Sequence, residues 1–129
     1  MRKKVILDTN FLLIPGQFKV DIFSEIERIM QEPFELCIVD KSIAELNKLA
    51  AGGRQIDKFA AKLALALIIQ KNLKTLHSFG SKKSVDDIIV AKADENTFIA
   101  TQDKALKERV KGKGAKIIGL RQQKYLVMM

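Results

Sequence analysis

Short apolar runs of strand length alternate along the chain with segments whose apolar residues recur at helical spacing. The strand-like runs cover residues 4–8, 34–40, 73–77, 97–101 and 115–120. This alternation predicts a parallel sheet covered by helices on both faces, which is a three-layer α/β/α sandwich. In such sheets a functional site lies beyond the carboxyl ends of the strands, where the strand order reverses.

Ordinary start and stop signals delimit the helical segments. Pro33 ends the first of them, and Gly52 with Gly53 ends the second. Ser84 is placed to cap the fourth. The apolar spacing predicts helices over residues 18–31, 42–51, 55–71, 84–95 and 104–111, and a short basic tail is expected after residue 120.

The chain has the size of one ordinary domain. Its 129 residues are 47% hydrophobic and no repeat or linker divides them, so residues 1–129 are expected to form a single domain. The longest apolar run is interrupted by Lys62 and is far shorter than the ~20 residues of a membrane span. The start lacks a signal-peptide pattern, and the single cysteine, Cys37, excludes an internal disulfide, so we expect a cytoplasmic protein.

Positive charge is concentrated at one end of the chain. Lys and Arg number 23 against 15 Asp and Glu, which gives a net charge of +8. The segment from Lys104 onward has one acid, Glu108, and eight basic residues: Lys104, Lys107, Arg109, Lys111, Lys113, Lys116, Arg121 and Lys124. A basic end on a near-neutral body favours a polyanionic partner, and a solvated lysine-rich helix face is the alternative.

Acidic side chains stand where the carboxyl edge of the predicted sheet should be. Asp8 ends the first strand inside "VILDTNFLL", and Asp103 follows the fourth strand. Glu45 and the pair Asp86–Asp87 lie in the first turns of helices, which begin at that same edge. Each acid except Asp8 also has a structural interpretation, with Ser42-x-x-Glu45 as a capping box and the others as acids or caps of helix N-termini.

Several carboxylates gathered at one place are electrostatically costly unless a cation neutralises them. Hard oxygen ligands of this kind suit Mg²⁺ or Mn²⁺. His77 is the only histidine of the sequence and Cys37 the only cysteine, so no zinc cluster competes. The pattern therefore predicts a magnesium or manganese site at the sheet edge.

Four segments, in this order, resemble the four motifs of PIN-domain ribonucleases: "ILDTNFLL", "SIAELNKL", "SVDDIIVAKA" and "IATQDKALKERVKGKGAKII". The resemblance covers nearly the whole chain. It implies a parallel five-stranded sheet of order 3-2-1-4-5, in which the first and fourth strands lie side by side. Asp8 and Asp103 would then lie close together.

The resemblance also implies an activity, which is metal-dependent endonucleolytic hydrolysis of RNA phosphodiester bonds. One or two Mg²⁺ or Mn²⁺ ions would be held by the acidic quartet Asp8, Glu45, Asp86 and Asp103. The supporting polar positions are Thr9, Asn10 and Thr101, and Asp87 is the alternative to Asp86 as the third acid of the quartet. The RNA backbone would be gripped by basic residues, namely Lys104, Lys107, Arg109, Lys111, Lys113, Arg121 and Lys124.

Other functions remain open at this stage. A haloacid-dehalogenase-type phosphatase needs a second Asp where Asn10 stands, and a receiver domain needs an Asp where His77 stands, so both fit poorly. A non-catalytic RNA-binding or assembly factor is the stronger rival. Among nucleases, the C-terminal "DKALKERVKGKGAKIIGLRQQKY" favours ribosomal RNA processing over the toxin half of a toxin–antitoxin pair. Expected partners are RNA, a second copy of the chain through the apolar helix 59–69, and an antitoxin or pre-ribosomal protein.

Overall fold

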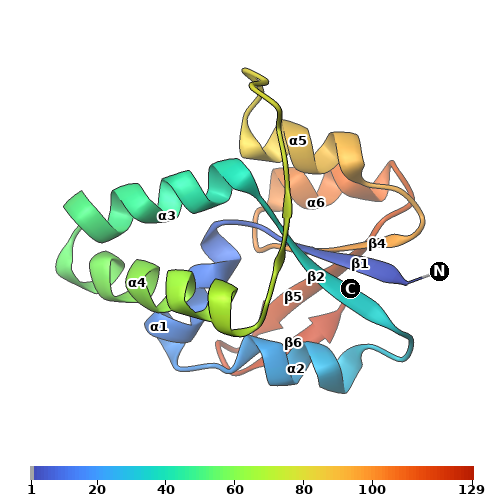
Figure 1. Ribbon diagram of the computed structural model, residues 1–129. Coiled ribbons are helices and arrows are strands. Elements are labelled where there is room, and N and C mark those ends of the chain that lie inside the picture. Colours follow the sequence, from blue (N-terminus) through green and yellow to red (C-terminus); the bar gives the residue numbers. More distant parts are fainter. Residues whose placement is uncertain (1) are drawn as a thin grey trace.

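A six-stranded sheet runs through the computed structural model, which describes residues 2–129 (Figure 1). The strands are β1 Lys3–Leu7, β2 Phe34–Val39, β3 Lys74–Leu76, β4 Thr97–Ala100, β5 Lys116–Arg121 and β6 Tyr125–Met128. Their order is β3-β2-β1-β4-β5-β6, and all neighbours are parallel except β5 and β6. The predicted sandwich and the 3-2-1-4-5 order are confirmed, whereas the prediction of five strands is one strand short.

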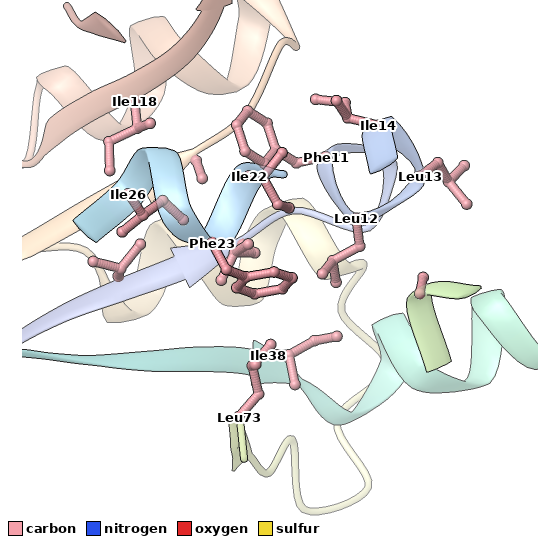
Figure 2. Close-up of a cluster of buried hydrophobic side chains, with 14 of the residues drawn as sticks. Phe11, Leu12, Leu13, Ile14, Ile22, Phe23, Ile26, Ile38, Leu73 and Ile118 are labelled. Carbon is pink, nitrogen blue, oxygen red and sulfur yellow. The ribbon is translucent and has the colours of Figure 1, made fainter. Parts of the chain in front are cut away.

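The sheet is apolar on both faces. Successive side chains of each strand point to opposite faces, and the strands are continuous apolar runs, so both faces receive apolar side chains. Val5 and Leu7 of β1 belong to one buried cluster, and Ile6 between them belongs to a second cluster on the other face. Figure 2 shows part of the first cluster, in which side chains of η1 and α2 gather against Ile38 of β2 and Ile118 of β5. Cys37 is buried in the second cluster, and burial raises the pKa of its thiol to about 11.

Helices cover the two faces unequally. The first cluster is covered by η1 Asn10–Leu13, α1 Ile14–Phe18, α2 Ile22–Ile29 and α4 Gln55–Gln70, and the second by α5 Val85–Lys92 and α6 Lys104–Lys111. The remaining helix, α3 Asp40–Gly52, packs beside α4 as an antiparallel pair (Figure 1). Each of α3, α5 and α6 follows a parallel strand, so all three begin at the carboxyl edge of the sheet.

The helix predicted over residues 18–31 is shorter than expected and is preceded by a separate short helix. Lys19 ends α1 in the left-handed region, at a φ of 58°. Asp21 then starts α2 as its N-cap, since its side chain accepts a hydrogen bond from the backbone of Ser24. The apolar spacing is continuous across this break and therefore conceals it.

The expected basic tail is instead a β-hairpin, and the prediction of a tail is wrong. The turn between β5 and β6 holds Gln122 and Gln123 at φ values of 56° and 55°. No Asn-Gly or Asp-Gly pair announces this turn in the sequence, which is why it was missed. The outer edge of β6 is covered by α2, because Leu126 N–H donates to Glu25 Oε1 at 3.0 Å and Arg28 Nη2 donates to the Leu126 carbonyl at 2.8 Å.

The apolar helix α4 is buried on one side and open on the other. Ala60, Ala61 and Ala64 are fully buried, whereas Phe59 is 60% exposed and Ile69 is 82% exposed. No helix within residues 2–129 combines the length and apolar character needed to cross a membrane.

Candidate active site

Four segments meet around one cavity of about 250 Å³ at the carboxyl edge of the sheet. They are the end of β1, the second turn of α3, the first turn of α5 and the N-cap of α6. The prediction that Glu45 lies in the first turn of its helix is wrong, because α3 begins at Asp40. The lining residues are Asp8, Thr9, Asn10, Glu45, Ser84, Val85, Asp86 and Asp103. The structure therefore brings together all four acids of the predicted quartet, from positions up to 95 residues apart in the sequence.

Asp8 is the most deeply placed acid of this cavity. It directly follows β1, its N–H donates to the Ala100 carbonyl at 2.9 Å, and only 6% of the residue is exposed. Its Oδ1 accepts a hydrogen bond of 2.8 Å from Thr9 N–H, and its Oδ2 accepts one of 2.9 Å from the Thr101 hydroxyl. Burial raises the pKa of Asp8 above its ordinary value, and the neighbouring carboxylates of Asp86 and Asp103 add to the rise.

Thr101 connects Asp8 with the segment that carries Asp103. The Thr101 side chain is fully buried, and its Oγ1 accepts a hydrogen bond of 3.0 Å from Asp103 N–H. Asp103 in turn caps α6, since its Oδ1 accepts from Leu106 N–H at 3.0 Å. The cap expected at Asp103 is thus present, and the capping residue is also part of the cavity wall.

Thr9 makes a second hydroxyl contact, this time to α3. Its Oγ1 donates to Glu45 Oε1 at 2.7 Å and is hydrogen bonded to Ser42 Oγ at 2.8 Å. The predicted capping box is wrong, because α3 begins at Asp40 and Ser42 lies within its first turn with the whole residue buried. Ser42 was therefore missed as a partner of the site, although its spacing of three residues from Glu45 places both on one helix face.

The structure separates the adjacent acids Asp86 and Asp87. Asp86 lines the cavity, and its pKa is raised by burial and by the neighbouring carboxylate of Asp103. Asp87 instead meets α6, where its Oδ1 accepts a hydrogen bond of 2.8 Å from Arg109 Nη2, and this contact lowers the pKa of Asp87. Ser84 caps α5 as expected, by accepting from Asp87 N–H.

The donor chemistry of the cavity fits a hard divalent cation. Its carboxylates and hydroxyls offer only oxygen atoms, which are the ligands that Mg²⁺ and Mn²⁺ prefer. The raised pKa values of Asp8 and Asp86 reflect burial together with mutual repulsion, and a cation would relieve the repulsion. Among residues 2–129, no three acidic, His or Cys side chains already stand together as a formed coordination site.

The basic residues of the C-terminal third do not form one surface. Lys104 opens α6 at the carboxyl edge. At that same edge Arg121 ends β5 and Lys124 lies in the β5–β6 turn. The chain returns to the opposite edge along α6, which places Lys111, Lys113 and Lys116 there. Lys107 lies one turn into α6, and Arg109 is paired with Asp87. Only part of the predicted RNA grip therefore lies near the cavity.

Comparison with protein families and curated proteins gives two kinds of match. A family model described as a PIN-like domain matches residues 5–123. "Ribonuclease VapC4" of Methanocaldococcus jannaschii is 34% identical over 124 residues, which cover 95% of this chain and 93% of that protein. "rRNA-processing protein fcf1" of Schizosaccharomyces pombe is 30% identical over 109 residues, which cover 83% of this chain and 53% of that protein.

Solved structures give similar results. The structure of the PIN domain endonuclease Utp24 matches with a TM-score of 0.79 and 26% identity, over 97% of this chain and 90% of that chain. A domain of a functionally unknown protein from Methanocaldococcus jannaschii matches with a TM-score of 0.61, over 92% of this chain and 91% of that chain. At 24% identity, this second match supports the fold alone.

Proposed function

Since this chain belongs to the PIN-like domain family, we propose that it is a divalent-metal-dependent endoribonuclease that hydrolyses RNA phosphodiester bonds at the cavity around Asp8. The observation that carries the proposal is the meeting of four carboxylates, from four separate segments, around that one cavity. The ribonuclease relative, which matches 95% of the chain, supports the same reaction class.

In this proposal Asp8, Asp86 and Asp103 hold one or two Mg²⁺ or Mn²⁺ ions, and Glu45 holds a second ion or orients water. The ion supplies a water molecule of lowered pKa and stabilises negative charge on the phosphate oxygens. Thr101 and Thr9 N–H fix the Asp8 carboxylate in one orientation. The Thr9 hydroxyl occupies Glu45 Oε1, which leaves Oε2 to accept a hydrogen bond from a water molecule.

Only the phosphate that is cut would enter the cavity with the metal ion, and the flanking RNA backbone must be held outside it, because phosphates and carboxylates repel each other. Lys104, Arg121 and Lys124 are exposed at the carboxyl edge of the sheet and are assigned this task. Asn10 is exposed at the cavity rim and is assigned to contact the substrate. Lys111 and Lys113 lie at the other edge, so the proposal gives them no contact with the strand being cut.

Ribosomal RNA processing is the preferred cellular role, supported by the likeness to the protein named for rRNA processing. The toxin half of a toxin–antitoxin pair is the second candidate. An apolar groove of about 500 Å³ favours it, since a small partner protein would cover the exposed Phe59 and the neighbouring Leu63 and Leu67 of α4. A second copy of the chain is the other occupant considered for this groove. Co-expression with the protein encoded by an adjacent small reading frame, followed by a cleavage assay, tests the toxin role.

The experiment that tests the activity is an RNA cleavage assay with the purified protein in millimolar Mn²⁺ or Mg²⁺, with EDTA as the control. The nuclease proposal expects cleavage with metal, none with EDTA, and none by Asp8→Asn in either condition. Wild type and Asp8→Asn that bind RNA equally, without cleaving it in any metal, would establish the non-catalytic RNA-binding factor instead.

A further inference from the structure

The loop between β3 and α5 presents an aromatic ring to solvent at its tip. Phe79 is 90% exposed, the largest exposed fraction of any large hydrophobic side chain among residues 2–129. The chain turns there through two left-handed residues, Phe79 at a φ of 51° and Gly80 at 76°. In Figure 1 this loop, coloured yellow, projects past α5. An exposed phenylalanine in a left-handed backbone is unfavourable on both counts, so a fold gains nothing from it.

The base of this loop is anchored to the start of α3. Asp40 Oδ2 accepts hydrogen bonds from Ser78 N–H at 2.9 Å and from the Ser78 hydroxyl at 3.1 Å. Lys41 Nζ donates to the carbonyls of Ser81 and Lys83 on the far side of the tip. Hydrogen bonds to α3 therefore hold the loop on both sides of its tip. The His77 ring lies beside the Phe79 ring, with 5.7 Å between the two ring centroids.

The tip is joined to the wall of the acidic cavity by a short stretch of chain. Ser84 and Val85, which line the cavity, come five and six residues after Phe79. Five residues span at most about 17 Å, so the ring lies within a few nucleotides of the carboxylates along a single strand. The anchoring helix α3 also carries Glu45, which lies on the cavity wall.

The surroundings of Phe79 favour a nucleic acid over a protein as its partner. Lys82 and Lys83 are exposed on the same loop, and Gly80 and Ser78 flank the ring. A protein contact would need neighbouring apolar side chains to form a continuous patch. One aromatic ring among cationic side chains instead matches the way proteins hold single-stranded RNA, with bases stacked on rings and phosphates on lysines.

We propose that Phe79 is a stacking platform for an unpaired base of the RNA strand that enters the acidic cavity, with Lys82 and Lys83 contacting the flanking phosphates. The inference deepens the proposed ribonuclease function and rests on it for the identity of the ligand. Stacking on Phe79 would position the strand, because the anchored loop fixes the distance between the stacked base and the carboxylates. It would also favour single-stranded over fully paired RNA.

The chain contains no tryptophan, so a tryptophan introduced at this position is a unique fluorophore. Phe79→Trp is titrated in EDTA, where cleavage is suppressed, with a short single-stranded RNA and with the same RNA made abasic. Stacking predicts strong quenching by the first RNA and little by the second. Phe59→Trp, on the 60% exposed Phe59 of α4, is the matched control and should not respond to either.

Affinity gives the second measurement. Phe79→Ala should weaken binding of the single-stranded RNA roughly 5- to 150-fold, the range of one base–aromatic stack. Phe79→Tyr should bind like wild type, and the abasic RNA should bind wild type and Phe79→Ala equally. The high exposure of Phe79 means that none of these changes removes a core contact.

Each outcome separates this inference from the proposed activity. If wild type binds RNA but cleaves none in Mn²⁺, and RNA quenches the fluorescence of Phe79→Trp, the nuclease proposal is refuted and the stacking platform is supported. A wild type that cleaves RNA while Phe79→Ala has unchanged affinity and unchanged kcat/KM overturns the stacking platform and assigns the ring to a protein contact. A wild type with no affinity for RNA overturns both.

Discussion

The Thr101 hydroxyl donates a hydrogen bond of 2.9 Å to Asp8 Oδ2, across the neighbouring ends of β4 and β1. Thr101 Oγ1 also accepts a hydrogen bond of 3.0 Å from Asp103 N–H. One buried hydroxyl therefore orients Asp8, the deepest acid of the cavity, and the segment that holds Asp103. A hydroxyl can do both because it has one proton to donate and lone pairs to accept. The geometry of the site thus depends on a residue that has no charge of its own.

Thr101→Val tests this dependence because it keeps the shape of the side chain and removes the hydroxyl. We expect cleavage to fall by roughly 10- to 100-fold, as for other partners that orient metal ligands. Thr97→Val is the matched control at the other end of β4, since the Thr97 side chain is also buried and its hydroxyl donates to the Asp94 carbonyl at the opposite edge of the sheet. Both variants should lose some stability in thermal melts, but only Thr101→Val should lose activity per folded molecule. Equal activities would show that Thr101 has no orienting role.

The two acids at the start of α5 give a test within one turn of helix. Asp86→Asn should lower cleavage by roughly a hundredfold or more, because the carboxylate lines the cavity and the amide cannot replace its charge. Asp87→Asn should lower it much less, since Asp87 is engaged with Arg109 outside the cavity. The measurement is kcat/KM in Mn²⁺ for both purified variants. A larger loss in Asp87→Asn would reverse the assignment.

The parts of the fold that follow local patterns could be predicted from the sequence. Continuous apolar runs such as the one around Ile6 identify the buried parallel strands, and their alternation with helices determines the layers. The antiparallel strand β6 could not be predicted, because Gln122 and Gln123 adopt left-handed conformations that their residue type does not announce. The start of α3 was misplaced because Asp40, which ends an apolar run, fits a strand end and a helix start equally well.

The candidate site was predictable as a set of acids but not as a network. The convergence of Asp8 and Asp103 follows from strand order alone, since β1 and β4 are neighbours. The contact of Thr9 with Ser42, by contrast, joins residues 33 positions apart and requires the first turn of α3 to lie beside the segment that follows β1. The Arg109–Asp87 ion pair likewise requires α5 and α6 to lie side by side. Such contacts are properties of the tertiary structure, and no spacing in the chain encodes them.

The raised pKa of Asp8 predicts how the stability of the metal-free protein changes with pH. Between the ordinary value of 3.8 and its raised value in the fold, Asp8 binds more protons in the folded than in the unfolded state. Stability contributed by Asp8 is therefore full below 3.8 and falls as the pH rises through the raised pKa. Asp8→Asn should show a smaller fall across that window and should equal or exceed wild type in thermal melts at pH 7 with EDTA.

Addition of a divalent ion should reverse that order. Millimolar Mn²⁺ binds the gathered carboxylates of the folded state and should raise the Tm of wild type by mass action. Asp8→Asn should gain less, because it has lost one carboxylate ligand. Asp87→Asn is the control that should gain as much as wild type, since Asp87 faces Arg109. An unchanged Tm of wild type in Mn²⁺, together with no heat of binding in calorimetry, would count against a metal site in this cavity.

The split of the basic residues between the two edges of the sheet predicts which of them contact RNA. One triple variant reverses charge at the edge that carries the cavity: Lys104→Glu, Arg121→Glu, Lys124→Glu. A second triple variant reverses the same amount of charge at the other edge: Lys111→Glu, Lys113→Glu, Lys116→Glu. For a single strand, the slope of log K against log[salt] changes by about 0.7 per phosphate contact, so the first variant should lose about 2 from its slope. The second should weaken binding mildly through net charge and keep its slope. Binding isotherms from 50 to 400 mM KCl, measured in EDTA, distinguish the two, and a slope lost only in the second variant would move the RNA to the amino edge and away from Asp8.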